Sequence, residues 1–276
     1  MIRQVVIAGA FIALAGPACA QDAPFTAPSA TAKYSPYPAQ DFPNQVLFGD
    51  THLHTAYSAD AGLVGARLTP DDAYRFAKGE TVVSSTGVPA RLARPLDFLV
   101  VSDHAENLGL PIALEKKSPV LMESDWGRKI VTTTAPQTIE SMIAGYELWM
   151  QQMNARTDPL KGTDFAKTMW QEVIAAAERH NNPRAFTALI GFEWTSGPNG
   201  NNLHRNVIFR DGKDLADTIV PLSAYETDDP ERLWDWMERY EQATGGRVLA
   251  IPHNGNLSNG LMFDNVTLTD KRPIDR

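Results

Sequence analysis

Two histidines one residue apart are the first residues of this chain that can act together chemically. His52 and His54 lie in the segment GDTHLHTAYSAD (49–60), which ends at Asp60. In an extended segment, residues i and i+2 point to the same side, so both imidazoles can reach one cation. The segment is therefore compatible with one wall of a metal site, and also with a polar turn at the surface.

Further side chains of the kind that bind metals stand next to apolar runs. Asp103 and His104 follow DFLVVS, Glu193 ends ALIGFE, and His253 follows VLAIP. His204 differs, because it precedes its apolar run, NVIF. A buried Asp-His pair can be a structural hydrogen bond, or a ligand that its neighbour holds in place.

Each remaining candidate has a structural interpretation beside the functional one. An unpaired carboxylate next to a buried strand is costly, so Glu193 either forms a salt bridge with a residue such as Arg205 or bridges two metal ions. A lone histidine such as His253 is more often a satisfied core residue than a ligand. His180 lies near the end of a predicted helix, where the helix dipole favours a cation, and we expect no role for it in a site.

Other classes of catalytic group are missing from the sequence. The only cysteine, Cys19, belongs to an N-terminal apolar segment, so the rest of the chain has neither a thiol nucleophile nor a thiolate ligand. There is no G-x-S-x-G motif, no P-loop and no Rossmann glycine fingerprint. A set of histidines and carboxylates without another nucleophile predicts chemistry by metal-activated water.

The elements that position these groups are predicted by hydrophobic pattern. Apolar runs that alternate with helical patterns predict an α/β fold with mostly parallel strands. In α/β barrels the chemistry collects at the carboxyl ends of the strands, so groups distant in sequence can converge. Strands are expected at residues 45–50, 97–103, 186–194, 205–211 and 246–254, and helices at residues 69–78, 138–155, 164–181 and 229–245.

The N-terminal segment has the pattern of an export signal. MIRQVVIAGAFIALAGPACA has a basic start, a short apolar run and a small-x-small end, which predicts a signal peptide (1–20) cleaved after Ala20. The run is too short to span a bilayer comfortably, so we expect no stable membrane anchor. Residues 21–43 are predicted to be a linker or extended arm, and residues 44–276 a globular domain. We therefore expect a periplasmic or secreted protein.

Composition and charge restrict the class of partner. The chain is 43% hydrophobic and 21% charged, which is too apolar for a disordered protein. Its formal net charge is −8, with no block of like charge, so nucleic acid is not a favoured partner. The net charge does not exclude a local site for a metal ion or a small anionic molecule, and the oligomeric state stays open.

The ordered motifs DTHLHTAYSAD, VVSDH, GFEW, NLHRNVIF and IPHN resemble the PHP superfamily, the polymerase and histidinol phosphatase class of metal-dependent hydrolases. They look most like an exported PHP-like family described as a domain of unknown function. The resemblance covers about Val46 to the end, and it implies a distorted (β/α)7 barrel with two or three divalent metal ions. On that pattern the metal ligands are His52, His54, Asp60, His104, Glu193, His204 and His253, with Glu193 bridging two ions.

One part of the family pattern has no counterpart in the sequence. PHP-like proteins end in an Asp-x-His motif that supplies two more ligands, whereas no histidine follows His253. We therefore expect a truncated domain, in which the barrel is incomplete and two metal ligands are missing.

The resemblance and the candidate ligands together predict a metal-dependent hydrolase of anionic esters, most directly a phosphoesterase. Zn, Mn and Fe ions all accept imidazole and carboxylate, so the metal stays open. Glu193 and Arg205 are the expected catalytic residues, Arg205 by holding an ester oxygen; the alternative for Arg205 is a structural role. The alternative functions are a sulfatase at the same site and a non-catalytic periplasmic protein that binds a metal or another ligand.

Overall fold

The structure, a computed structural model, describes residues 46–274. The expected signal peptide (1–20), its cleavage point after Ala20, the expected linker (21–43) and Cys19 lie outside the described residues. Within residues 46–274, no helix combines the length and the apolar character needed to cross a bilayer.

Three short parallel strands form the first sheet of this mixed α/β structure. β1 (Gly49–Asp50), β4 (Phe98–Val100) and β5 (Thr187–Leu189) lie side by side in the order β1-β4-β5. Parallel strands need long crossover connections, and the segments between these strands contain most of the helices. Each strand begins within or at the edge of a predicted apolar run, but is shorter than that run.

The second three-stranded sheet is antiparallel, which corrects the expectation of mostly parallel strands. β6 (Gly191–Trp194), β7 (Arg205–Phe209) and β8 (Val248–Pro252) lie in the order β6-β7-β8. The connection from β6 to β7 contains only one short 3-10 helix, η2 (Pro198–Gly200), and a connection of this kind returns the chain in the opposite direction. Because β7 is reversed, its start lies beside the end of β8.

The apolar run expected as one strand at 186–194 is divided between the two sheets. β5 ends at Leu189 and β6 begins at Gly191, and the carbonyl of Ile190 accepts a hydrogen bond from Phe209. A Cβ on Gly191 would lie 2.8 Å from the Val207 carbonyl oxygen, so only glycine allows this close approach. Hydrogen bonds from Glu193 N to Asp103 O and from Ala105 N to Glu193 O then join the segment after β4 to β6. We call this junction the seam.

The four predicted helices are confirmed, and cap residues hold several of their ends. They are α2 (Pro70–Ala77), α6 (Ile139–Ala155), α7 (Phe165–His180) and α9 (Pro230–Thr244). Thr69 and Thr138 form capping boxes, in which each side chain accepts the backbone N–H three residues on. Gly245 ends α9 with a φ of 71°, a left-handed conformation that favours glycine.

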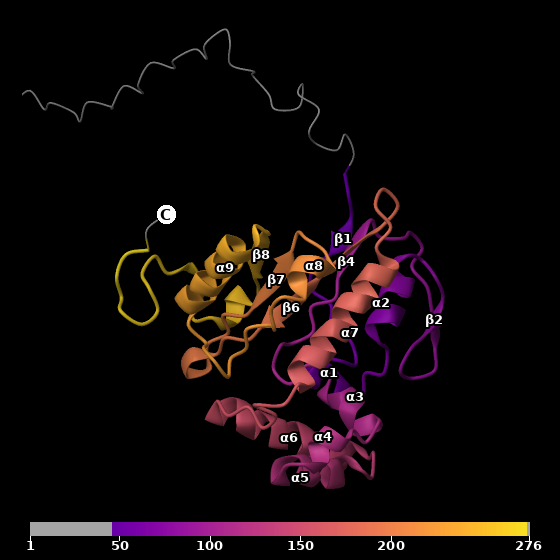
Figure 1. Ribbon diagram of the computed structural model, residues 1–276. Helices are drawn as coiled ribbons and strands as arrows, with labels where there is room; N and C mark the ends of the chain where they lie inside the picture. Colours follow the sequence, from indigo (N-terminus) through magenta and orange to yellow (C-terminus); the bar gives the residue numbers. More distant parts are fainter. Residues whose placement is uncertain (1–45, 275–276) are drawn as a thin grey trace, which may run out of the picture. The chain divides into compact units, whose positions relative to one another are not determined.

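Several shorter elements have no counterpart among the predictions. They are α1 (Ala59–Gly62), α3 (Leu110–Glu115), α4 (Pro119–Met122), α5 (Asp125–Thr134), α8 (Lys213–Ala216), the hairpin of β2 (Val82–Val83) and β3 (Pro89–Ala90), η3 (Gly255–Leu257) and η4 (Leu261–Phe263). Most of these span fewer than two turns, so periodicity alone does not reveal them. Figure 1 shows α4, α5 and α6 together at one end of the domain, below the strands.

An aromatic core fixes β6 and β7 against the helices. Phe192 and Phe209, from adjacent strands, pack with Trp170 of α7 and with Trp236 and Tyr240 of α9. The indole N–H of Trp170 donates to the Ala216 carbonyl at 2.9 Å, so its one polar group is paired. Truncating a buried aromatic side chain of this kind to alanine typically costs about 3–5 kcal/mol. This core gives β6 a rigid support.

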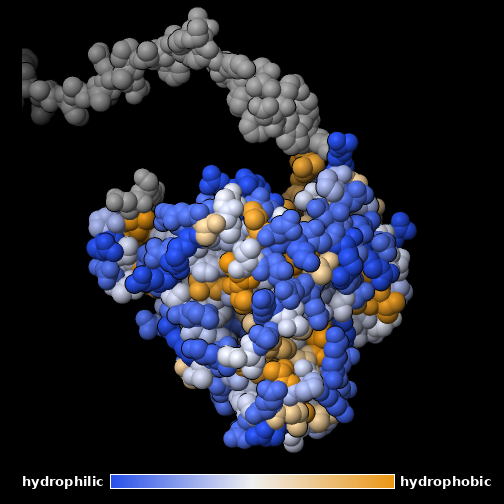
Figure 2. All heavy atoms as spheres, viewed as in Figure 1, coloured by the Kyte–Doolittle hydropathy of each residue, from blue (hydrophilic) through white to orange (hydrophobic). Residues whose placement is uncertain are grey.

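The surface in Figure 2 is mainly hydrophilic, with separated hydrophobic spots. Exposed apolar side chains occur at the start of the described chain, on Leu47 and Phe48 beside β1, and on Leu249 of β8. Both β1 and β8 are outer strands of their sheets within residues 46–274.

Candidate metal centre

Glu193 stands at the centre of the candidate site. It lies on β6 between Phe192 and Trp194, whose side chains are buried in the core. Because alternate residues of a strand face opposite sides, Glu193 points away from that core. Its side chain is nevertheless only 1% exposed, because histidines from three other segments cover it.

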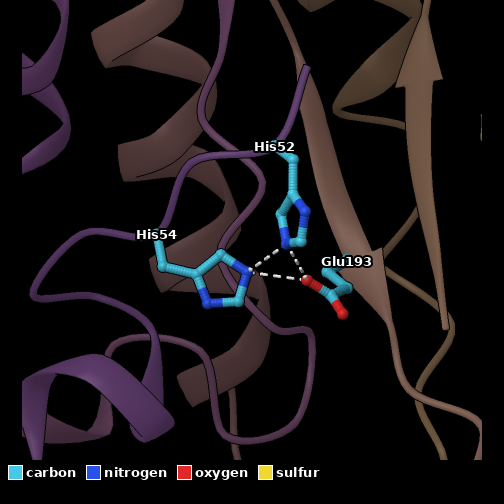
Figure 3. Close-up of side chains that lie close together, drawn as sticks. All are labelled: His52, His54 and Glu193. Atoms are coloured by element: carbon cyan, nitrogen blue, oxygen red, sulfur yellow. Dashed lines mark hydrogen bonds and ion pairs between the residues drawn. The ribbon is translucent and has the colours of Figure 1, made fainter. Parts of the chain in front are cut away.

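His52 and His54 reach one oxygen of this carboxylate from the loop after β1 (Figure 3). Their Nε2 atoms lie 3.0 Å and 2.6 Å from Glu193 Oε2 and 3.2 Å from each other. The i, i+2 geometry expected from the sequence therefore brings both imidazoles to one point.

Backbone anchors hold this loop in position. The Asn206 side chain donates to the Thr51 carbonyl at 2.9 Å, and the Asp103 carboxylate accepts hydrogen bonds from the backbone and the hydroxyl of Thr55. Asp103 thus binds the loop, and its carboxylate is not hydrogen-bonded to the imidazole of His104. Burial raises the pKa of Asp103 to about 6, against the hydrogen bonds from Thr55, which lower it.

His204 and His253 contact the other oxygen of Glu193. His204 Nδ1 and His253 Nε2 each lie 2.8 Å from Oε1. One histidine precedes β7 and the other follows β8, and the backbones meet through a hydrogen bond from His253 N to His204 O. The antiparallel pairing explains why His204 comes before its strand, whereas the other histidines of the site follow theirs.

Asp60 and His104 complete the cluster on its remaining side. His54 Nδ1 lies 3.1 Å from Asp60, while His104 Nε2 lies 3.6 Å from Asp60 Oδ2 and 3.9 Å from Glu193 Oε1. The Ser58 hydroxyl donates to Asp60 at 2.6 Å and so orients this carboxylate. All seven residues predicted as ligands from the resemblance therefore lie together, in what we call the histidine cluster.

The donor atoms of the histidine cluster form three overlapping groups that could hold a metal ion. The groups are His52–His54–Glu193, His54–Asp60–His104 and His104–Glu193–His204. Two ligands bound tetrahedrally to one zinc ion, each at about 2.1 Å, lie about 3.4 Å apart. The separations in the first group, 2.6–3.2 Å, are shorter than that spacing, so these side chains would move slightly apart around an ion. Only nitrogen and oxygen atoms are present, which suits Zn, Mn and Fe ions.

The electrostatics of the histidine cluster favour a cation. Burial lowers the pKa of His54, but hydrogen bonds with Asp60 and Glu193 outweigh it and raise the pKa to about 10. Burial also lowers the pKa of His104, and the charge of Glu193 raises it overall. In the other direction, burial raises the pKa values of Asp60 and Glu193, whereas the histidines around them hold both well below their usual range. The carboxylates thus create a field that stabilises positive charge.

Arg205, expected to hold a substrate oxygen, does not join the histidine cluster. It follows His204 directly, and neighbouring strand residues face opposite sides. Its guanidinium donates to the Leu203 carbonyl and lies over the Trp194 ring, with the cation 5.9 Å from the ring centroid. Burial lowers the pKa of Arg205 to about 10. The structure therefore supports the structural alternative for Arg205, and the salt bridge considered between Arg205 and Glu193 is not formed.

His180 also lies apart from the histidine cluster, as expected. Its Nε2 is 2.9 Å from Asp71 Oδ1, and its ring stacks on Tyr74 of α2. Asp71 additionally accepts hydrogen bonds from Arg179, so this group ties the end of α7 to the start of α2. The two helices run side by side in Figure 1.

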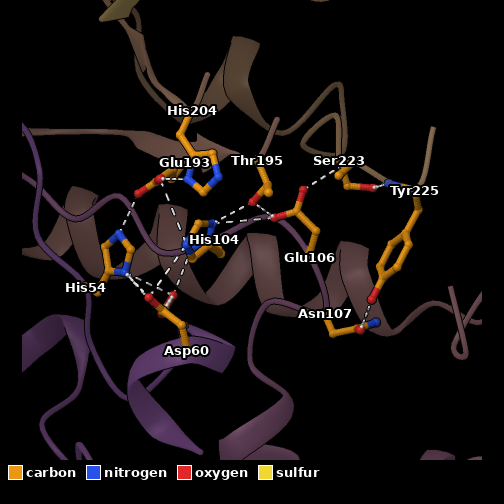
Figure 4. Close-up of polar contacts among 12 residues, drawn as sticks. His54, Asp60, His104, Glu106, Asn107, Glu193, Thr195, His204, Ser223 and Tyr225 are labelled. Atoms are coloured by element: carbon orange, nitrogen blue, oxygen red, sulfur yellow. Dashed lines mark hydrogen bonds and ion pairs between the residues drawn. The ribbon is translucent and has the colours of Figure 1, made fainter. Parts of the chain in front are cut away.

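Two supporting residues were not identified from the sequence. Thr195 and Glu106 contact His104 on the side away from Glu193, as Figure 4 shows. Glu106 lies two residues after His104 in SDHAEN, and an acidic residue so close to a buried histidine was an available signal. Thr195 gave no signal, because only the fold places it beside His104.

Comparison with known proteins identifies one family. Residues 41–276 match the family described as "Protein of unknown function (DUF3604)". No curated protein and no solved structure matches the chain.

Proposed function

We propose that this chain, which belongs to the DUF3604 family, is a metal-dependent hydrolase of anionic esters, and most directly a phosphoesterase. The description of the family names no activity, so the proposal depends on the site. The observation that carries it is the convergence of four imidazole nitrogens, at 2.6–3.0 Å, on the two oxygens of the buried Glu193 carboxylate. Such a set of neutral and anionic donors is typical of metal-hydrolase sites.

Two or three divalent ions, of Zn, Mn or Fe, are proposed for the histidine cluster. When bound, such ions lower the pKa of a water molecule towards neutrality and stabilise negative charge on ester oxygens. The residues proposed to hold them are His52, His54, Asp60, His104, Glu193, His204 and His253.

The residues of the chain also indicate how an anionic ester would bind. Asp60 and Glu193 contribute two negative charges, and two divalent ions contribute four positive charges, which leaves a net charge of +2. The site would therefore attract an anion although the chain as a whole is acidic. The side chains of His52 and Asp60 are 38% and 34% exposed, more than the other members of the cluster, so we expect the ester to approach beside them.

The proposal includes the wider features that the resemblance implies. These are a PHP-like, distorted (β/α)7 barrel around the histidine cluster, and export to the periplasm or the medium after removal of a signal peptide. Arg205 has no part in the proposed mechanism, because its side chain faces the opposite side of β7 from His204.

The test is to measure metal content and ester hydrolysis on the same purified full-length protein. We expect bound Zn, Mn or Fe by elemental analysis, hydrolysis of aryl phosphates, and loss of both after chelation. His52→Ala should lower the bound metal and the activity, while His180→Gln, which changes a histidine outside the cluster, should leave both unchanged. Full activity in a metal-free preparation would contradict the proposal.

Two other outcomes would identify the alternative functions. Hydrolysis of an aryl sulfate in preference to the matched aryl phosphate would identify a sulfatase. Tight metal binding without turnover across the ester panel would identify a non-catalytic binding protein.

A further inference from the structure

A chain of buried polar groups leads away from the histidine cluster at His104 (Figure 4). His104 Nδ1 lies 2.8 Å from the Thr195 hydroxyl, which in turn lies 2.6 Å from Glu106 Oε2. Glu106 Oε1 accepts the backbone N–H of Ala224 at 2.6 Å. His104 is 7% exposed and Glu106 is fully buried, so water does not compete for these bonds.

The direction of these hydrogen bonds is determined by the groups available. A carboxylate can only accept, so the Thr195 hydroxyl donates its single proton to Glu106. The hydroxyl oxygen is then left with lone pairs only, and the hydrogen bond to His104 requires Nδ1 to be the donor. A neutral imidazole with its proton on Nδ1 has a free lone pair on Nε2. This Nε2 is the atom that faces Asp60 and Glu193.

We propose that Thr195 and Glu106 are positioning residues, which hold His104 in the tautomer that leaves Nε2 free to bind a metal ion. The inference rests on the proposed function, since it assigns a role within the metal site. Buried carboxylates and hydroxyls that bind the second nitrogen of a ligand histidine fix both its ring orientation and its tautomer. Here the hydroxyl of Thr195 lies between the two groups and links the Glu106 carboxylate to His104 Nδ1.

Glu106 could instead serve only to anchor a neighbouring segment, and the test must distinguish that role from the positioning of His104. It binds the segment 221–228 through Ala224, and the neighbouring Asn107 accepts a hydrogen bond from Tyr225 at 2.6 Å. If Glu106 served only to anchor that segment, the tautomer of His104 would not depend on it.

Glu106→Gln distinguishes these roles through hydrogen-bond direction. The glutamine carbonyl can still accept from Ala224, while its amide donates to Thr195. The Thr195 hydroxyl must then donate to His104 Nδ1, which moves the imidazole proton to Nε2. We expect ¹⁵N NMR of the metal-free protein at alkaline pH to show His104 protonated on Nδ1 in the wild type and on Nε2 in Glu106→Gln.

Metal affinity provides the second measurement. We expect Thr195→Val, which keeps the shape but lacks the hydroxyl, to weaken binding of added Zn²⁺ by about 10- to 100-fold. Thr195→Ser should restore it. The matched control is Ser196→Ala. The fully buried Ser196 hydroxyl also binds the segment 221–228, by donating to the Asp228 carbonyl at 2.6 Å, but it does not contact His104.

The outcomes separate this inference from the proposed function. Unchanged Zn²⁺ affinity and an unchanged His104 tautomer in Glu106→Gln and Thr195→Val would overturn the positioning role. Equal weakening by Thr195→Val and Ser196→Ala would also overturn it, since that result indicates general loosening. If the wild type binds no metal, the proposed function fails, and the NMR tautomers alone decide whether Thr195 and Glu106 position His104.

Discussion

The carboxylate of Glu193 is shared among more partners than any other side chain of the histidine cluster. Each oxygen accepts from two imidazoles, and the side chain is almost fully buried. An anion in such a place is costly unless positive charge compensates it. Protonated histidines or metal ions are the groups available to do so.

Removing the negative charge of Glu193 without changing the shape of the side chain should therefore strongly weaken metal binding. We expect Glu193→Gln to lower the affinity for Zn²⁺ by roughly 100-fold, at the upper end of the range known for residues around metal sites. Isothermal titration calorimetry on the full-length protein measures this change. Glu172→Gln is the matched control, because Glu172 accepts a hydrogen bond from Tyr57 outside the histidine cluster. Equal affinities in the wild type and Glu193→Gln would rule out Glu193 as a bridging ligand.

At the scale of residues, the family resemblance predicted which residues form the histidine cluster, but not the direction of every side chain. The i, i+2 rule placed His52 and His54 correctly. The same alternation puts Arg205 on the opposite side from His204, and applying it there would have excluded Arg205 as a site residue. Thr195 could not be found from the sequence, since its role depends on a neighbour 91 residues away.

At the scale of elements, α2 and α7 are held together by a small charged group. Asp71 accepts hydrogen bonds from Arg179 and His180. Burial raises the pKa of Asp71, but these partners outweigh it and lower the pKa below its ordinary value of 3.8. An acid whose pKa is lowered on folding stabilises the protein above the unfolded pKa, and this contribution is lost as pH falls through the folded pKa.

Asp71→Asn should accordingly destabilise the protein only while the carboxylate is charged. The group is partly exposed, so we expect a loss of roughly 0.5–1 kcal/mol at pH 7. The difference from the wild type should shrink as the pH falls below about 4. Urea unfolding of both proteins at several pH values measures it. A difference that stays constant down to acidic pH would show that the ion pairs contribute nothing.

The helices with cap residues were predictable, whereas the strand directions were not. Thr69-Pro70 and Gly245 mark their helix ends through local chemistry that needs no tertiary contact. The division of 186–194 at Ile190 depends on pairing with Phe209 and on the close approach at Gly191. A continuous apolar run contains no information about such long-range contacts.

At the scale of the whole described domain, hydrophobic side chains are exposed beside β1 and on β8, which are both outer strands. Leu47 and Phe48 lie beside β1, and Leu249 of β8 is 59% exposed. Outer strands offer unpaired backbone groups, and apolar side chains beside them promote association with another chain.

Leu249→Lys should reduce this association. We expect the wild type to show an apparent mass that rises with concentration in sedimentation velocity experiments, and the lysine variant to show a smaller rise because charge opposes pairing of strand edges. Val88→Lys is the control, since Val88 is equally exposed but lies in the turn of the β2–β3 hairpin. Identical behaviour of the wild type and Leu249→Lys would show that β8 is not a site of association.

The seam between the two sheets has a mechanical consequence. His52, His54 and His104 come from the ends of the parallel sheet, whereas Glu193, His204 and His253 come from the antiparallel sheet. A divalent ion bound by the histidine cluster would therefore cross-link the parallel sheet and the antiparallel sheet. At an ion concentration one hundred times the dissociation constant, such binding adds about 2.7 kcal/mol to stability. Cellular metal supply would then control how readily the domain comes apart, and so how long it survives proteases.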